Sequence, residues 1–300
     1  MDVFFDDTYC GAGHAFDTTR KAALLATNLC EHPIEGIALR SPTPATCVDL
    51  ERIHHPDYVA ALLSGVPEGL AWSSGLGWDS GHVAAVLAST GGCIDAARSA
   101  WRDGIAGTLS SGLHHARTST GAGYCTVNGL ALAALTFLDL GAPRVLIVDL
   151  DAHCGGGTAD IAGSDERISA VDISTSAFDY YDHTEKWSLD VVHHGEDYLA
   201  MVRRRLAEVP DGSFDAVVYN AGMDSHEDCS VGGIDGITDE ILAERERMVF
   251  EFAANAPAPI MFALAGGYSS ADMGTDHLTA LHRLTVEAAA RAAQTRAVAP

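Results

Sequence analysis

The segment VLIVDLDAHCGGG, residues 145–157, places side chains that can bind a metal directly after a run of apolar β-forming residues. Asp149, Asp151 and His153 are alternate residues, so they point to one side while the chain stays extended. Asp151 and His153 offer a carboxylate oxygen and an imidazole nitrogen to a single ion. The two acids could instead cap a helix and a turn, but the glycines that follow are hard to explain that way. The segment therefore predicts a metal site.

A second apolar run, residues 216–220, ends in the same manner, with Asp224, His226, Glu227 and Asp228 after it. One carboxylate from a neighbouring strand would complete an Asp, His, Asp set with room for water, as a catalytic zinc-type site requires. We predict Asp224 as this third ligand because it is closest to the strand end, with His226 as the competitor. The other polar residues fit a solvated loop, since further ligands would close the site to substrate.

Three histidine pairs occur, and only one has a catalytic context. His114-His115 lies between a helical run and a Gly-rich loop, where ring nitrogens can face a cavity and act as acid and base. Taken alone, the pair could equally be buried and structural. The remaining pairs each precede a helical run and are assigned to helix entry: His54-His55 and His193-His194.

The segment PIMFALAGGYSS, residues 259–270, ends a β-run in Gly266, Gly267 and Tyr268. The glycines let the backbone approach closely, and the phenol at the strand end could donate to a developing oxyanion. A core aromatic with its hydroxyl bonded locally is the alternative reading of Tyr268.

The elements that must position these residues alternate between short apolar runs and helical patterns, which predicts an α/β fold with a parallel sheet covered by helices. The expected strands are apolar throughout, as strands buried on both faces are; they cover residues 3–5, 145–149, 168–173, 216–220 and 260–265. Helical patterns occur near residue 20, near residue 60, over 81–104, and from 127, 197 and 239. We expect one domain over residues 1–300, with a frayed tail from about residue 292.

Charge and composition restrict the partners. Forty-one acidic and 18 basic residues give a net charge of −23, which makes nucleic acid and anionic membrane surfaces unsuitable partners and favours cationic small molecules or basic peptides. The seven scattered cysteines contain no C-x-x-C, so neither a disulfide framework nor a cysteine zinc site is indicated. No secretory signal or membrane span is evident, and a cytoplasmic location is expected.

Four segments in this order resemble the signature of the histone deacetylase and acetylpolyamine amidohydrolase superfamily: GLHHARTSTGAGYCTVNG, VLIVDLDAHCGGGT, NAGMDSHEDCSVGG and LAGGYSS. The resemblance covers nearly the whole chain. It implies the arginase/deacetylase α/β fold with an eight-stranded parallel sheet, and a hydrolase that removes an acyl group from an amine. It also implies zinc, or iron(II) in the cell, held by Asp151, His153 and Asp224, together with a structural potassium or sodium ion.

The same resemblance implies roles for the other site residues. His115 would be the general base and then acid, His114 its electrostatic partner, and Tyr268 the donor that polarises the amide carbonyl. The remaining residues would support the cation, the acyl channel or the internal acetate channel: Asp149 and Ser174 for the cation, Gly123, Tyr124, Gly266 and Gly267 for the acyl channel, and Arg20 for the acetate channel.

The chain departs from the family's pattern in two segments. Where many relatives carry a second histidine and an acid or amide, it has Cys154 and Gly156. The carboxylate that would orient His115 is thus missing, which puts its acid and base roles in question. The family's Pro-Gly-Thr-Gly segment is not evident in AFDYYDHTEKW, residues 177–187, and the rim of the site is expected to differ. Cys154 is taken as a packing residue.

Two other functions compete. A binuclear manganese ureohydrolase of the same fold needs a further acid where this chain has Gly155. A catalytically silent acyl-binding protein is expected to have lost a ligand, a histidine of the pair or the tyrosine, and none is lost. The residues do not choose between acetyl-lysine, acetylpolyamines and other small N-acyl amines as substrate, nor between a monomer and a homo-oligomer.

Overall fold

The computed structural model describes residues 1–12, 17–111 and 113–298. Its centre is one sheet of eight strands in the order β2-β1-β3-β8-β7-β4-β5-β6, and every neighbouring pair is parallel. The strands are β1 (Asp2–Phe4), β2 (Ala38–Arg40), β3 (Ile105–Thr108), β4 (Val145–Asp149), β5 (Ile168–Ser174), β6 (Trp187–Val191), β7 (Ala216–Ala221) and β8 (Ile260–Leu264). The predicted parallel α/β fold is therefore confirmed.

The connections between strands contain helices, as is usual for parallel neighbours, except for the irregular loop of residues 175–186 that joins β5 to β6. The long helices are α1 (Asp17–Glu31), α5 (Ser80–Asp103), α6 (Gly129–Asp139), α8 (Gly195–Glu208), α9 (Asp239–Asn255) and α10 (Thr275–Val298). Shorter ones are η1 (Asp7–Cys10), α2 (Cys47–Leu50), α3 (Pro56–Ser64), α4 (Glu68–Ala71) and α7 (Gly156–Ala162). None of the helices described is both long and apolar enough to cross a membrane.

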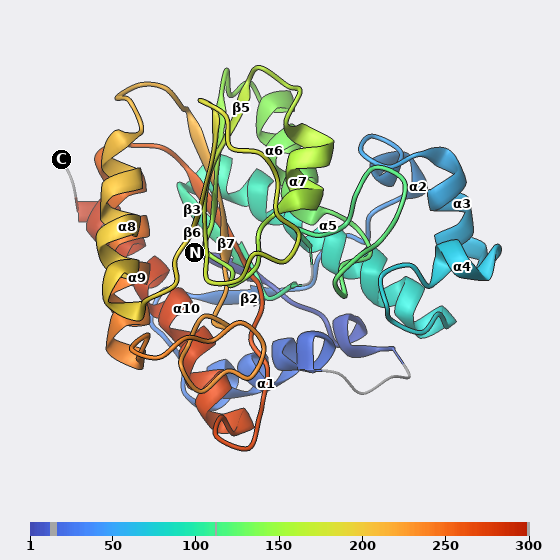
Figure 1. Ribbon diagram of the computed structural model, residues 1–300, viewed down its shortest axis with the longest axis horizontal. Helices are drawn as coiled ribbons and strands as arrows, with labels where there is room; N and C mark the ends of the chain where they lie inside the picture. Colours follow the sequence, from blue (N-terminus) through green and yellow to red (C-terminus); the bar gives the residue numbers. More distant parts are fainter. Residues whose placement is uncertain (13–16, 112, 299–300) are drawn as a thin grey trace.

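Helices cover both faces of the sheet, which is why the strand residues are buried without alternation. In β4, Leu146 and Val148 pack in the core that α1, α8, α9 and α10 share, while Val145 and Ile147 pack against α5 and α6. Figure 1 shows α8, α9 and α10 on one side of the sheet and α5, α6 and α7 on the other.

The topology brings the carboxyl ends of the central strands together. From β4 the chain continues to β5 and β6 at one edge, whereas β7 and β8 lie on the opposite side of β4. The order of the strands thus reverses between β4 and β7, and open α/β sheets bind ligands beyond the strand ends at such a point.

Two expectations about the elements need correction. The apolar runs indicated five of the eight strands, because β2, β3 and β6 lack a long apolar run. Strand β3 contains Gly107, where a Cβ would lie 2.1 Å from the ring of Phe262. The expected frayed tail from about residue 292 is helical to Val298 in α10. Arg296 holds this end of the helix, because its guanidinium donates to the carbonyl groups of Gly104, Ala253 and Ala258.

Candidate metal centre

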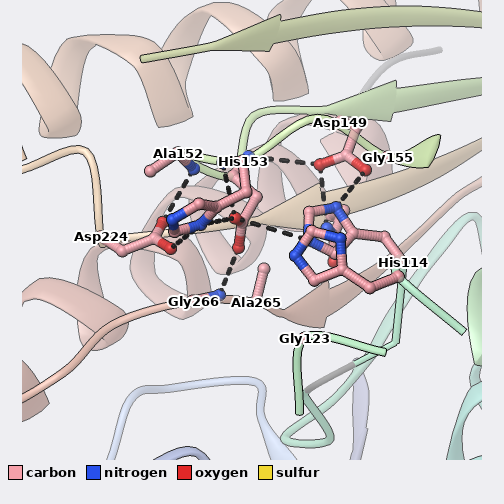
Figure 2. Close-up of polar contacts among 12 residues, drawn as sticks. His114, Gly123, Asp149, Ala152, His153, Gly155, Asp224, Ala265 and Gly266 are labelled. Carbon is pink, nitrogen blue, oxygen red and sulfur yellow. Dashed lines mark hydrogen bonds and ion pairs between the residues drawn. The ribbon is translucent and has the colours of Figure 1, made fainter. Parts of the chain in front are cut away.

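The three predicted ligands meet at the carboxyl edge of the sheet. Asp151 and His153 follow β4, and Asp224 follows β7, the strand beside it. One ligand atom from each lies within 4.8 Å of the others. Nδ1 of His153 lies 3.1 Å from Oδ1 of Asp151 and 3.2 Å from Oδ2 of Asp224, so it faces both carboxylates (Figure 2).

This donor set fits a divalent metal ion. Two carboxylates and one imidazole are ligands that zinc and similar ions take, and three protein ligands leave a position open for chemistry. Oδ2 of Asp224 is buried and forms no hydrogen bond among the residues described, although Nδ1 of His153 lies 3.2 Å away as an ion-pair partner. Burial raises the pKa of this carboxyl group, and the charge of Asp151 raises it further. A cation between the carboxylates would relieve both effects.

Backbone amides orient the two carboxylates. The N–H of Gly266 donates to Oδ2 of Asp151 at 2.6 Å, and the N–H of Ala152 donates to Oδ1 of Asp224 at 2.9 Å (Figure 2). A Cβ on Gly266 would lie 1.8 Å from Oδ2 of Asp224, so the glycine is required for the carboxylate to stand there. Gly267 adopts a φ of +149°, which few side chains tolerate.

His114 is buried between two carboxylates. Its Nδ1 lies 2.9 Å from Oδ2 of Asp149, and its Nε2 lies 3.5 Å from Oδ1 of Asp151. Burial opposes charging of the ring, but Asp149 and then Asp151 outweigh it and raise the pKa of His114 to about 10. Asp149 is itself held by the side-chain amide of Asn220 at 2.9 Å. In the metal-free protein these carboxylates favour the cationic form of the ring.

His115 lies against His114, with ring centroids 4.0 Å apart. Burial lowers its pKa, the neighbouring His114 lowers it further, and the result is a pKa of about 4. The expectation that His115 lacks an orienting carboxylate is wrong, because Oδ2 of Asp179 lies 2.9 Å from its Nδ1. Asp179 was missed because its segment, after β5, matches no family motif. Its position next to Phe178, which packs edge-on against His115, is set by the tertiary fold.

The predicted donor and channel residues adjoin these groups. One small cavity is lined jointly by His114, His115, Gly123, Asp151, Gly266 and Tyr268. Burial raises the pKa of the Tyr268 phenol, and Asp224 and Asp151 raise it further, so the hydroxyl keeps its proton. A Cβ on Gly123 would lie 2.4 Å from the ring of His115. Tyr124 is 40% exposed and does not line this cavity; it lines a neighbouring one with Leu113 and Val127.

The two residues predicted to hold a monovalent cation, Asp149 and Ser174, lie beside Asp172, a buried carboxylate that the sequence analysis did not single out. Asp149 and Asp172 are partners in the register of β4 and β5, and Ser174 donates to Asp172 at 2.8 Å. Burial raises the pKa of Asp172 to about 8, and Asp149 contributes to the shift. The cation itself stays a prediction.

Arg20 does not face the site as predicted. Its side chain is exposed on α1. The next residue, Lys21, is buried instead, where its ammonium donates to the carbonyl of Ala265 and lies 5.8 Å from the ring of Tyr268. One helical residue corresponds to a turn of about 100°, so consecutive residues face different sides.

His226, the competing ligand, belongs to a separate group. Its Nε2 lies 2.9 Å from Asp239, which also pairs with His277 at 2.8 Å. Nδ1 of His226 accepts from the N–H of Asp228 at 3.1 Å, so the proton is on Nε2 and that nitrogen donates to Asp239. This hydrogen bonding accounts for the group without a metal.

The other two histidine pairs lie at the starts of helices α3 and α8. His55 caps α3 by accepting from the N–H of Asp57, as its position before the helix indicates. His54 is buried and links the Arg117 carbonyl to the Asn128 N–H. His194 stands at the N-cap of α8 without a side-chain bond to it.

Comparison with known proteins extends over most of the chain. Residues 14–284 match the family model described as the histone deacetylase domain. An uncharacterized protein of Picosynechococcus sp. is 33% identical over 237 residues, which cover 73% of this chain and 75% of that protein. Histone deacetylase 2 of Arabidopsis thaliana is 28% identical over 292 residues, which cover 90% of this chain and 74% of that protein.

Two solved structures share the fold. The crystal structure of the HDA15 HD domain has a TM-score of 0.76 and 17% identity, with 97% of this chain and 89% of that one covered. The acetylpolyamine aminohydrolase from Burkholderia pseudomallei has a TM-score of 0.75 and 17% identity, with 96% and 98% covered.

Proposed function

This chain belongs to the histone deacetylase family, and from that premise we propose that it is a zinc-dependent amidohydrolase that removes an acetyl or similar acyl group from an acylated amine. Family membership makes it a metal-dependent hydrolytic deacetylase that acts on acylated amines. Zinc as the metal, and acetyl-lysine or an acetylpolyamine as the substrate, are the finer parts of the proposal. The net charge of −23 favours an amine that carries positive charge elsewhere.

One observation carries the proposal. The Asp151, His153 and Asp224 group adjoins the His114-His115 pair, and Asp151, both histidines and Tyr268 line the same cavity. A site for a Lewis acid, a neutral imidazole and a protonated phenol thus face one small space, which is the set of groups that hydrolysis of an amide requires.

The ligands Asp151, His153 and Asp224 would hold the ion. When bound, it would polarise the amide carbonyl and make water acidic enough to attack near neutral pH. His115, neutral at this pH, accepts the proton of the attacking water. Tyr268 donates a hydrogen bond to the carbonyl oxygen as it gains negative charge. His114 stays cationic between Asp149 and Asp151 and stabilises that charge. A histidine then returns a proton to the amine as the carbon–nitrogen bond breaks, and the products are a carboxylate and a free amine.

Metal content and activity test the proposal together. Purified protein is stripped of metal, reloaded separately with zinc, iron(II) or manganese, and analysed for metal per chain. The same samples are assayed on an acetyl-lysine peptide, an acetylated polyamine and arginine. We expect about one ion per chain, release of acetate, and loss of both in Asp151→Asn because a ligand is removed.

Asp239→Asn is the matched control, because Asp239 is the carboxylate of the second histidine group and lies outside the cavity. It should retain metal and activity. Zinc-loaded protein that releases acetate from neither amide would contradict the proposal. Two manganese ions per chain with cleavage of arginine would indicate a ureohydrolase instead.

A further inference from the structure

His115 has a carboxylate partner outside the signature segments. Oδ2 of Asp179 lies 2.9 Å from Nδ1 of His115, and both side chains are buried, with 8% and 5% of their surfaces exposed. A carboxylate only accepts hydrogen bonds, so Nδ1 carries the hydrogen. Nε2 is then the ring nitrogen that can accept a proton. The contact thus sets which nitrogen of His115 is basic.

Asp179 is held in this place from several directions. Its backbone is in the left-handed region, with a φ of 61°, which aspartate adopts more readily than most residues. Arg117 forms an ion pair with Oδ1, and the N–H of Gly157 donates to Oδ2 at 3.2 Å. The preceding carbonyl, that of Phe178, accepts from the N–H of Cys154 at 3.0 Å. The loop after β5 is therefore fastened to the turn after β4.

Gly156 provides the space that Asp179 occupies. A Cβ on residue 156 would lie 2.3 Å from the Asp179 carbonyl oxygen and 2.6 Å from its Oδ1. Any side chain at 156 would therefore exclude Asp179 from its present position. The same Cβ would lie 2.7 Å from the carboxyl carbon of Asp179. An aspartate at 156 would thus place its carboxylate in nearly the same volume.

We propose that Asp179 is the positioning residue for His115, and that the absence of a side chain at Gly156 leaves the space that Asp179 occupies. The carboxylate comes to the histidine from the loop after β5 instead of from the turn after β4. The inference deepens the proposed function and rests on it. The competing explanation is that Asp179 and Arg117 only clamp the loop, and that the contact with His115 has no consequence for the reaction.

Moving the carboxylate from residue 179 to residue 156 distinguishes the two explanations. Asp179→Ala should lower kcat by about 100-fold, in the range of one acid–base group, with KM within about threefold because Asp179 does not line the cavity. Gly156→Asp combined with Asp179→Gly takes the carboxylate off the loop after β5, so that Arg117 no longer clamps this loop, but returns a carboxylate to His115 from the turn after β4. The double variant should have a kcat at least about tenfold higher than that of Asp179→Ala.

Asp160→Asn is the control, because Asp160 lies 4.0 Å from the same Arg117 and accepts from Thr118. It should keep kcat within about twofold. If Asp179→Ala keeps kcat within threefold of wild type, or if the double variant is as slow as Asp179→Ala despite being folded, the proposal is wrong. Asp179→Asn serves in place of the alanine variant should that one fail to fold.

A measurement on metal-free protein makes the inference separable from the proposed function. With ¹⁵N-labelled histidine, His115 should give a strongly downfield Nδ1 proton, assigned by its absence in His115→Ala. The signal should vanish in Asp179→Ala and return in the double variant. A preserved signal in Asp179→Ala would overturn the inference. Wild-type protein with the signal but no deacetylase activity would refute the proposed function alone.

Discussion

Gly266 is the position where one added methyl group should most disturb the metal centre. In Gly266→Ala, the new Cβ would lie 1.8 Å from Oδ2 of Asp224 and 2.7 Å from Oδ2 of Asp151. Because Gly266 does not have a positive φ, the conflict is steric and involves no backbone strain. Real Cβ contacts are longer than 3.0 Å, so the Asp224 carboxylate must retreat by about 1.2 Å. Ligand distances tolerate only about 0.2 Å.

The expected loss follows from that displacement. Metal affinity should fall by at least about 100-fold, equivalent to about 2.8 kcal/mol. The metal-free variant should also lose about 1–3 kcal/mol of unfolding free energy, since the residue is overpacked. Competition with a chelating dye measures the first quantity, and urea unfolding of metal-free protein measures the second.

Gly274→Ala is the matched control. Gly274 lies in the same connection after β8, and nothing lies within 4 Å of its Cβ position. Metal affinity should be unchanged in this variant. If Gly266→Ala binds metal within about threefold of the Gly274→Ala protein, Asp224 does not ligate the ion from the position described, and the reasoning fails.

Two further predictions concern protons and stability. Burial opposes charging of His153, but Asp151 and Asp224 raise its pKa to about 11 in the metal-free protein. Its ring is therefore protonated at pH 7.5 and must lose that proton to bind a metal, so calorimetry in two buffers of different ionisation enthalpy should show release of about one proton per ion. Affinity should rise with pH, and no proton release would contradict this ligand assignment. Glu246→Gln should cost about 3–5 kcal/mol of unfolding free energy, because it leaves the fully buried Arg245 without its ion-pair partner. Glu244→Gln, a partly exposed position on the same helix, should cost less than about 1 kcal/mol, and equal losses in urea unfolding would refute the distinction.

The sequence identified the buried strands that consist of long apolar runs. Strands β4, β5, β7 and β8 are long and buried on both faces, so their apolar runs identified them from the sequence. Strand β3 is equally buried but consists of Ile, Ala, Gly and Thr, because the ring of Phe262 fills the space over Gly107. Such a strand is defined by its neighbours, and a single-sequence pattern does not reveal it.

The sequence likewise predicted some of the site residues and missed others. Asp151, His153 and Asp224 each stand at the end of a recognisable strand, and parallel strands bring their carboxyl ends to one edge. Lys21 could have been preferred over Arg20 only by knowing which face of α1 points inward.

The sequence by itself determined the parallel α/β fold, the family and the residues that face one another at the strand ends, because short-range patterns and motif spacing carry that information. Only the tertiary structure decided which carboxylate reaches His115. Asp179 is 64 residues away from it, and the contact depends on the path of an irregular loop, on Arg117 and on the absence of a side chain at Gly156. A contact of that kind is set by excluded volume among distant segments, which no local pattern records.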